Sequence, residues 1–177
     1  LIELHTDNHE KYFEPRPGVN WPHMDALIAH DAQLATAGIT TVFDAIAIGY
    51  GVGASNANRE RIAAQSIDTL LDIRHQGVFR VDHHIHLRCE CSCEGTSAYF
   101  EPWAGVDGID LVSLMDHAPG QRQFASIDKY IEYYKKKYGY TDEALKQVMD
   151  DHFKASEAFS DPNRQAIYWL LYTSPSP

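Results

Sequence analysis

Hydrophobic and polar positions follow two periods along this chain, one typical of strands and one typical of helices. Strands are predicted at residues 1–7, 39–48, 78–90 and 111–115, where residues are β-branched, strictly alternating or continuously apolar. Helices are predicted at residues 24–37, 60–76, 127–138 and 142–159, and one more begins at residues 163–171. Strand and helix alternate as in repeated βαβ units, so we expect an α/β fold with a parallel sheet and helices outside it.

Polar residues gather where the predicted strands end, which favours a (β/α)-barrel mouth over a dinucleotide-binding crevice. No G-x-G-x-x-G motif or phosphate-binding P-loop follows any of these strands. His5 and Asp7 lie two residues apart in the first strand, a spacing that aims both side chains to one side and suits two ligands of one metal. The alternative is that both residues cap an exposed strand end.

The third strand alternates sharply between residues 81 and 90. One face carries five ionisable residues, Asp82, His84, His86, Arg88 and Glu90. Buried unpaired charge is costly, so this face must meet water, partners or a site. In a barrel it would face the interior, with Glu90 as a metal ligand and Arg88 holding a substrate anion. An edge strand with one wetted face is the alternative.

The stretch from residue 111 to residue 124 is the most informative in the chain, because a short apolar strand ends on Asp116 and His117. By alternation His117 points inward, as a metal ligand and catalytic group, while Asp116 orients a neighbour; both are catalytic candidates. Arg122 in the following loop is an anion clamp, or else it pairs with a surface acid. Arg16, between two prolines, is a third arginine for holding substrate phosphates.

Charge and composition narrow the classes of function. The net charge of −10 argues against non-specific nucleic-acid binding, and no apolar run is long enough for a membrane helix. Cys89, Cys91 and Cys93 are an odd, clustered set and a poor disulfide framework, so a reducing cytoplasm is expected. These cysteines with the neighbouring histidines could instead form a small non-catalytic zinc module, although the C-x-C-x-C spacing is unusual for one.

Four segments, LIELHTDN, AHDAQLATAGITTVFDA, HLRCE and LVSLMDHAPGQRQF, resemble the amidohydrolase-like M-protein family of the carbon–phosphorus lyase pathway. The resemblance runs from Leu1 to about Ala166. It implies a metal-dependent (β/α)₈ TIM-type barrel in the amidohydrolase superfamily. The implied reaction is that of a phosphoric anhydride hydrolase, which cleaves α-D-ribose 1-methylphosphonate 5-triphosphate to the 5-phosphate and diphosphate. An amidohydrolase acting on a C–N bond is the alternative within the superfamily.

The resemblance also implies a ligand set and a length. The metal ligands would be His5, Asp7, Glu90 and His117, around a divalent ion expected to be zinc. Members of the family are more than twice as long, so residues 1–171 are expected to form the N-terminal half of the barrel and to be inactive alone. Residues 172–177, with their Ser-Pro repeat, are expected to be a disordered or foreign tail. Homo-oligomerisation is left open.

Overall fold

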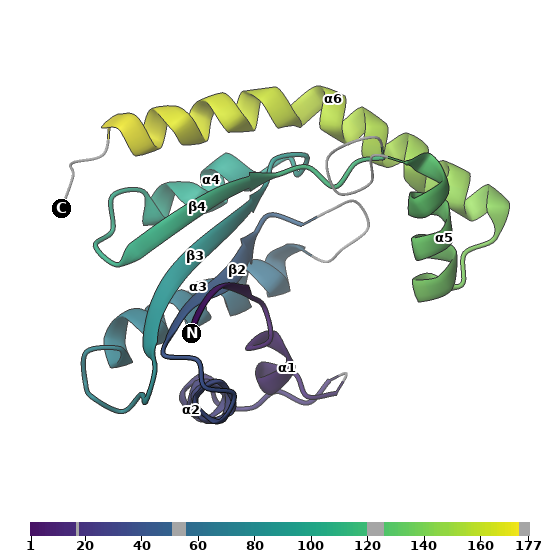
Figure 1. The fold of residues 1–177 in the computed structure, drawn as a ribbon. Coiled ribbons are helices and arrows are strands. Elements are labelled where there is room, and N and C mark those ends of the chain that lie inside the picture. Colours follow the sequence, from purple (N-terminus) through teal and green to yellow (C-terminus); the bar gives the residue numbers. More distant parts are fainter. Residues whose placement is uncertain (17, 51–55, 120–125, 174–177) are drawn as a thin grey trace. The chain divides into compact units, whose positions relative to one another are not determined.

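The computed structural model describes residues 1–16, 18–50, 56–119 and 126–173. The strands are β1 (Ile2–Thr6), β2 (Thr41–Ile48), β3 (Asp82–Glu90) and β4 (Ile109–Met115). They form one sheet in the order β1-β2-β3-β4, in which β1 and β2 pair in parallel (Figure 1). The predicted α/β fold with a parallel sheet is therefore confirmed. The sheet is consistent with part of a TIM-type barrel, while the barrel itself stays a prediction.

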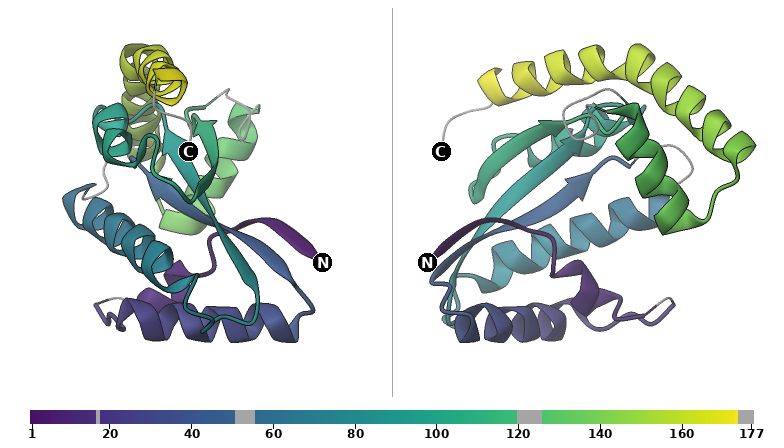
Figure 2. Two further views of the ribbon diagram at one scale, coloured as in Figure 1. Left: turned by 90° about the vertical axis from the view of Figure 1, so that its left-hand side faces the viewer. Right: turned by 45° about the vertical axis from the view of Figure 1, so that its right-hand side comes forward.

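The helices of the described chain are α1 (Glu10–Phe13), α2 (His23–Thr36), α3 (Asn56–Ile73), α4 (Thr96–Phe100), α5 (Ile127–Tyr138) and α6 (Asp142–Thr173), with a 3₁₀ turn η1 (Glu101–Trp103). Helix α2 joins β1 to β2, and α3 joins β2 to β3. Both views of Figure 2 show α3 running along one face of the strands. The short helices α1, α4 and η1 lie in segments without helical periodicity, where one or two turns leave no pattern in the sequence.

Contacts divide the chain into two compact units. The first comprises Leu1–Ala47, Ala57–Arg88 and Val106–Ser113, and the second comprises Ile48–Asn56, Cys89–Gly105 and Leu114–Pro177. The carboxyl ends of β3 and β4 thus belong to the second unit. The first unit buries apolar residues of α2, β2 and the segment just before β3, including Leu34, Val42 and Val81. The second has a smaller core between α5 and α6, built on Tyr130 and Leu145.

Gly49, directly after β2, shows why the strand ends there. Its φ is +76°, a left-handed conformation that favours glycine, and an added Cβ would lie 2.1 Å from the hydroxyl oxygen of Thr96. The end of β2 is therefore packed against the loop that follows β3.

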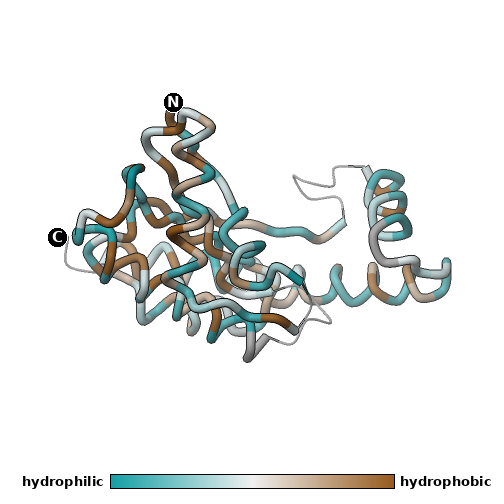
Figure 3. The backbone as a smooth tube through the Cα atoms, turned by 90° about the horizontal axis from the view of Figure 1, so that it is seen from below, coloured by the Kyte–Doolittle hydropathy of each residue, from teal (hydrophilic) through white to brown (hydrophobic). Residues whose placement is uncertain are grey.

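Helix α6 departs from the prediction, because it runs without a break through Pro162 to Thr173. The sequence suggested two helices separated near residues 160–162. A proline inside a helix removes one backbone N–H bond and crowds the preceding turn, but side chains on both sides of Pro162 bind other parts of the second unit. Figure 3 shows both hydrophobic (brown) and hydrophilic (teal) residues along the visible part of α6. Tyr172 and Thr173, placed in the predicted tail, are still helical.

Candidate active site at the ends of β3 and β4

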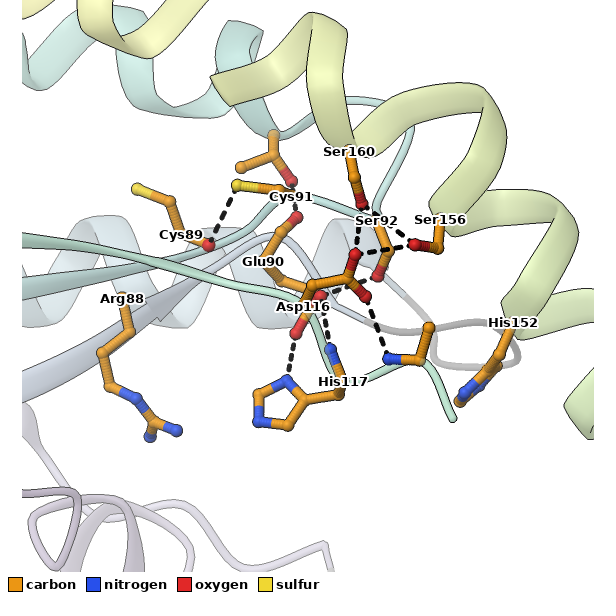
Figure 4. A network of polar contacts seen from close by, with 12 residues as sticks. Arg88, Cys89, Glu90, Cys91, Ser92, Asp116, His117, His152, Ser156 and Ser160 are labelled. Carbon is orange, nitrogen blue, oxygen red and sulfur yellow. Dashed lines mark hydrogen bonds and ion pairs between the residues drawn. The ribbon is translucent and has the colours of Figure 1, made fainter. Parts of the chain in front are cut away.

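The last residue of β3 and the second residue after β4 contact each other in the second unit. The Glu90 carboxylate Oε2 contacts the Nδ1 of His117, and Oε1 accepts bonds from the His117 backbone N–H at 3.3 Å and the Ser92 hydroxyl at 2.6 Å (Figure 4). We call these two side chains the Glu90–His117 pair. Parallel strands end at the same edge of a sheet, which explains why residues far apart in sequence meet here.

Burial and hydrogen bonding set the pKa of Glu90 and the position of the proton in the Glu90–His117 pair. Burial raises the pKa of Glu90, but the bonds from His117 and Ser92 outweigh it, so the pKa lies below the ordinary glutamate value. An ionised carboxylate can only accept, so Nδ1 of His117 carries a proton, and in the neutral ring Nε2 is the nitrogen with a lone pair. The His117 side chain is 30% exposed against 5% for Glu90. This geometry suits His117 to accept a proton from a water molecule or a substrate group.

Asp116 turns away from the pair and toward α6. Its carboxylate accepts hydrogen bonds from Ser156 at 2.7 Å, Ser160 at 2.6 Å and the backbone N–H of Ala118 at 2.9 Å. Burial raises its pKa, but these bonds outweigh the effect and the pKa lies below the ordinary aspartate value. The contacts give Asp116 a role in positioning the loop after β4, and a direct catalytic role stays a prediction.

His5 and Asp7 belong to the first unit. Strand β1 ends at Thr6, and its pairing with β2 shifts register between Glu3 and Thr6. The simple alternation that placed His5 and Asp7 on one strand face is therefore interrupted at this bulge. Both residues are exposed. The first unit brings each of them near a residue of β3.

The contacts with β3 join His5 to His86 and Asp7 to Arg88. The two imidazole rings lie edge to face with centroids 5.3 Å apart, and a guanidinium nitrogen of Arg88 lies 3.7 Å from the Asp7 carboxylate. The four predicted metal ligands are thus divided, with His5 and Asp7 in the first unit and Glu90 and His117 in the second. Their convergence on one metal stays a prediction.

The other predicted substrate-binding arginines lie outside these contacts. Arg16 is exposed, and its backbone forms an isolated bridge with Val19. Arg122 lies outside the described residues. Phosphate binding by Arg16, Arg88 and Arg122 therefore stays a prediction.

A buried cluster in the first unit was missed from the sequence. The Asp44 carboxylate is fully buried between two histidines, with the Nδ1 of His83 at 2.6 Å and the Nε2 of His30 at 3.2 Å. Asp31 accepts bonds from the backbone N–H groups of Arg80 at 2.8 Å and Val81 at 3.0 Å. Burial alone would raise the pKa of Asp44, but the hydrogen bonds from both histidines hold it below the ordinary value. A lone acid within the apolar run 39–48 was the signal, because a buried acid must be paired.

The residues present are only a partial match to a metal site. Glu90 and His117 supply oxygen and nitrogen donors of the kind zinc prefers, but a structural or catalytic zinc takes three or four protein ligands. Within the described ranges, no group of three or more His, Cys, Asp and Glu side chains could hold a metal. The three cysteines are buried, and burial raises the pKa of the Cys91 thiol to about 11. A Cys/His zinc module therefore has no support in the geometry.

One curated protein shares extensive sequence with the chain. It is the α-D-ribose 1-methylphosphonate 5-triphosphate diphosphatase of Escherichia coli (strain K12), 44% identical over 167 residues. The resemblance seen in the motifs is confirmed. The aligned region covers 94% of this chain and 44% of the length of that diphosphatase. No family model and no solved structure matches the chain. No described helix combines the length and apolar character needed to cross a membrane.

Proposed function

We propose that the protein containing this chain is a phosphoric anhydride hydrolase of phosphonate degradation. Its substrate would be α-D-ribose 1-methylphosphonate 5-triphosphate, and its products the corresponding 5-phosphate and diphosphate. The observation that carries the proposal is the 44% identity to a diphosphatase with that substrate in its name, maintained over 94% of the chain. The Glu90–His117 pair lies within the matched length and supplies a chemically suitable group.

The proposed chemistry uses the lone pair on Nε2 of His117. Glu90 holds the proton on Nδ1 and stabilises the positive charge that develops when Nε2 accepts a proton from water. The water oxygen forms a new bond to phosphorus as the anhydride bond between the retained phosphate and the leaving diphosphate breaks. Arg16, Arg88 and Arg122 are proposed to hold phosphate oxygens, for which a planar guanidinium is well shaped.

A divalent metal, with zinc as the expected ion, is also proposed for the complete site. Glu90 and His117 are two of its proposed donors. Nε2 of His117 would either bind the metal or accept the proton, so the steps above are those of the side chains alone. The three buried cysteine thiols are compatible with the predicted cytoplasm. Elemental analysis of the purified protein tests the metal directly, and protein without bound divalent metal would contradict it.

The function is tested by diphosphate release from the ribose triphosphate. His117→Gln and Glu90→Gln should each lower kcat by roughly a hundredfold or more, the typical contribution of a positioned acid or base. His75→Gln is the matched control, because His75 is exposed and belongs to the first unit. A wild-type protein that releases no diphosphate contradicts the proposed reaction. Unchanged kcat in both variants of the pair removes it from the active site.

A further inference from the structure

Helix α6 binds the loop that follows β3 through one buried amide. The side-chain nitrogen of Asn163 donates hydrogen bonds to the backbone carbonyls of Cys91 at 2.9 Å and Cys93 at 2.7 Å. Its side-chain oxygen accepts a bond from the backbone N–H of Ser97 at 3.2 Å. Both donors and the acceptor of the amide are thus engaged, and the residue is 4% exposed. Asparagine supplies this combination, whereas aspartate has the same shape and no donor.

The two carbonyls that Asn163 holds flank Ser92, whose hydroxyl donates to the Glu90 carboxylate at 2.6 Å. The backbone N–H of Cys93 in turn donates to the Glu90 carbonyl at 3.1 Å. The loop therefore contacts Glu90 through both its side chain and its backbone. A shift of this loop moves the carboxylate that orients His117.

One to two helical turns before Asn163, the same helix also contacts the loop that follows β4. Ser156 and Ser160 donate to the Asp116 carboxylate, which lies next to His117 in the chain. A guanidinium nitrogen of Arg164 lies 3.7 Å from the same carboxylate. Residues 160, 163 and 164 follow residue 156 by four, seven and eight positions, so the four residues share one face of α6. Figure 4 shows both serines directed at Asp116.

We propose that α6 positions the Glu90–His117 pair, with Asn163 setting Glu90 through the loop after β3, and Ser156 and Ser160 setting His117 through Asp116. These three α6 residues are positioning residues, which act on the pair through the two loops. The consequence for catalysis rests on the proposed function. The geometric consequence, an intact bond between Glu90 and His117, does not depend on it.

The main test is Asn163→Asp in the protein containing this chain. The substitution keeps the side-chain shape, removes both N–H donors and places a carboxylate against two carbonyls. NMR of histidine-labelled protein follows the proton on Nδ1 of His117. The Glu90 carboxylate shifts this resonance strongly downfield, and its loss in Glu90→Gln assigns it. We expect this resonance to shift or disappear. We also expect kcat to fall roughly ten- to a hundredfold with KM changed less than about twofold, as for misplacement of a catalytic group.

Gln165→Glu is the matched control, since it makes the same amide-to-carboxylate change at an exposed position of the same helix. It should leave the resonance and kcat as in the wild type. An unchanged resonance in Asn163→Asp, or an equal change in Gln165→Glu, overturns the proposal. A shifted resonance with unchanged kcat upholds the positioning by α6 and overturns the assignment of the pair to the active site.

The double variant Ser156→Ala with Ser160→Ala tests the second loop, and it provides an independent measurement where Asn163→Asp does not fold. It removes two donors to Asp116 and introduces no charge. We expect a smaller shift of the His117 resonance and a fall in kcat of roughly tenfold. Thr173→Ala, which removes an exposed hydroxyl from the same helix, is its control. A folded double variant with the wild-type resonance contradicts the role assigned to the serines.

Discussion

At the scale of single residues, the second unit and the first use buried carboxylates in different ways. Glu90 contacts a partly exposed histidine, His117, which a substrate could reach. Asp44 is enclosed by His30 and His83, and the side chains of all three residues are fully buried. We therefore interpret the Asp44 cluster as part of the stability of the first unit, whereas the Glu90–His117 pair is the proposed site of chemistry.

Replacement of Asp44 by Asn should destabilise the protein strongly at neutral pH. Disrupting a buried, hydrogen-bonded carboxylate and its partners typically costs about 3–5 kcal/mol. Because the folded-state pKa of Asp44 is lowered, its ionic contribution is fully present above the unfolded-state pKa of about 4 and is lost as the pH falls below it. The difference in free energy of unfolding between wild type and variant, measured by denaturant titration at several pH values, should therefore shrink below pH ~4.

Asp68→Asn is the control for this measurement, because Asp68 is exposed on α3. Its effect should stay within about 0.5 kcal/mol at every pH. A difference for Asp44→Asn that is small at neutral pH, or that grows on acidification, would contradict the role assigned to the cluster.

At the scale of the element, α6 shows tertiary contacts overriding a local signal. Pro162 lies inside the helix, on its exposed side, while Ser160 and Asn163 on either side are buried and hydrogen-bonded. Those contacts hold the chain helical across a residue that disfavours a helix interior. The helix would otherwise be expected to end one turn earlier.

Pro162→Ala should therefore stabilise the protein. Alanine restores the backbone N–H and relieves the crowding of the preceding turn, effects of about 3 kcal/mol in a helix interior. A more flexible unfolded chain opposes this by about 0.4–1 kcal/mol, which leaves a net gain of roughly 2 kcal/mol. The gain is measured as a higher denaturant midpoint with an unchanged slope.

Gln165→Ala, at another exposed position of α6, is the comparison and should change stability by less than about 0.5 kcal/mol. A lower midpoint for Pro162→Ala would show that proline suits this position of α6 better than alanine does, contrary to this interpretation.

At the scale of the whole molecule, the described sheet has two outer strands, β1 and β4. Apolar side chains on these strands are exposed, with Leu4 61% and Ile2 60% accessible on β1 and Leu111 38% accessible on β4. Outer strands with exposed apolar residues are prone to pair with other chains. In a longer protein, further segments would be able to cover them.

The 177 residues expressed by themselves should therefore associate with increasing concentration and release no diphosphate. Sedimentation velocity over a range of concentrations measures the association. Ile2→Lys with Leu4→Lys should reduce it, because lysine on an outer strand opposes pairing. The same two lysines placed at positions 158 and 165, which are exposed on α6 and carry no large apolar side chain, provide a charge-matched control. A monomeric wild-type chain that turns over the ribose triphosphate would contradict both expectations.

The amino-acid sequence by itself determined the local elements and the order in which they follow one another. Alternating, β-branched and continuously apolar runs predicted the four strands of the described residues, and period-3.6 patterns predicted the long helices, with α6 divided in two near Pro162. These patterns reflect which parts of each element are buried. Alternation along residues 81–90 and the polar end of the 111–115 strand also singled out Glu90 and His117. These signals are local, so they can be read from the sequence without knowledge of the fold.

Only the tertiary structure decided which of these groups meet. Asn163 and Cys91 are 72 residues apart, and His83 and Asp44 are 39 apart, so no local pattern records either contact. The same holds for the continuity of α6 through Pro162, where long-range hydrogen bonds outweigh the preference of one residue. Burial of a side chain depends on the whole fold. It distinguishes the buried, paired acid Asp44 from the solvent-exposed acids that resemble it in sequence.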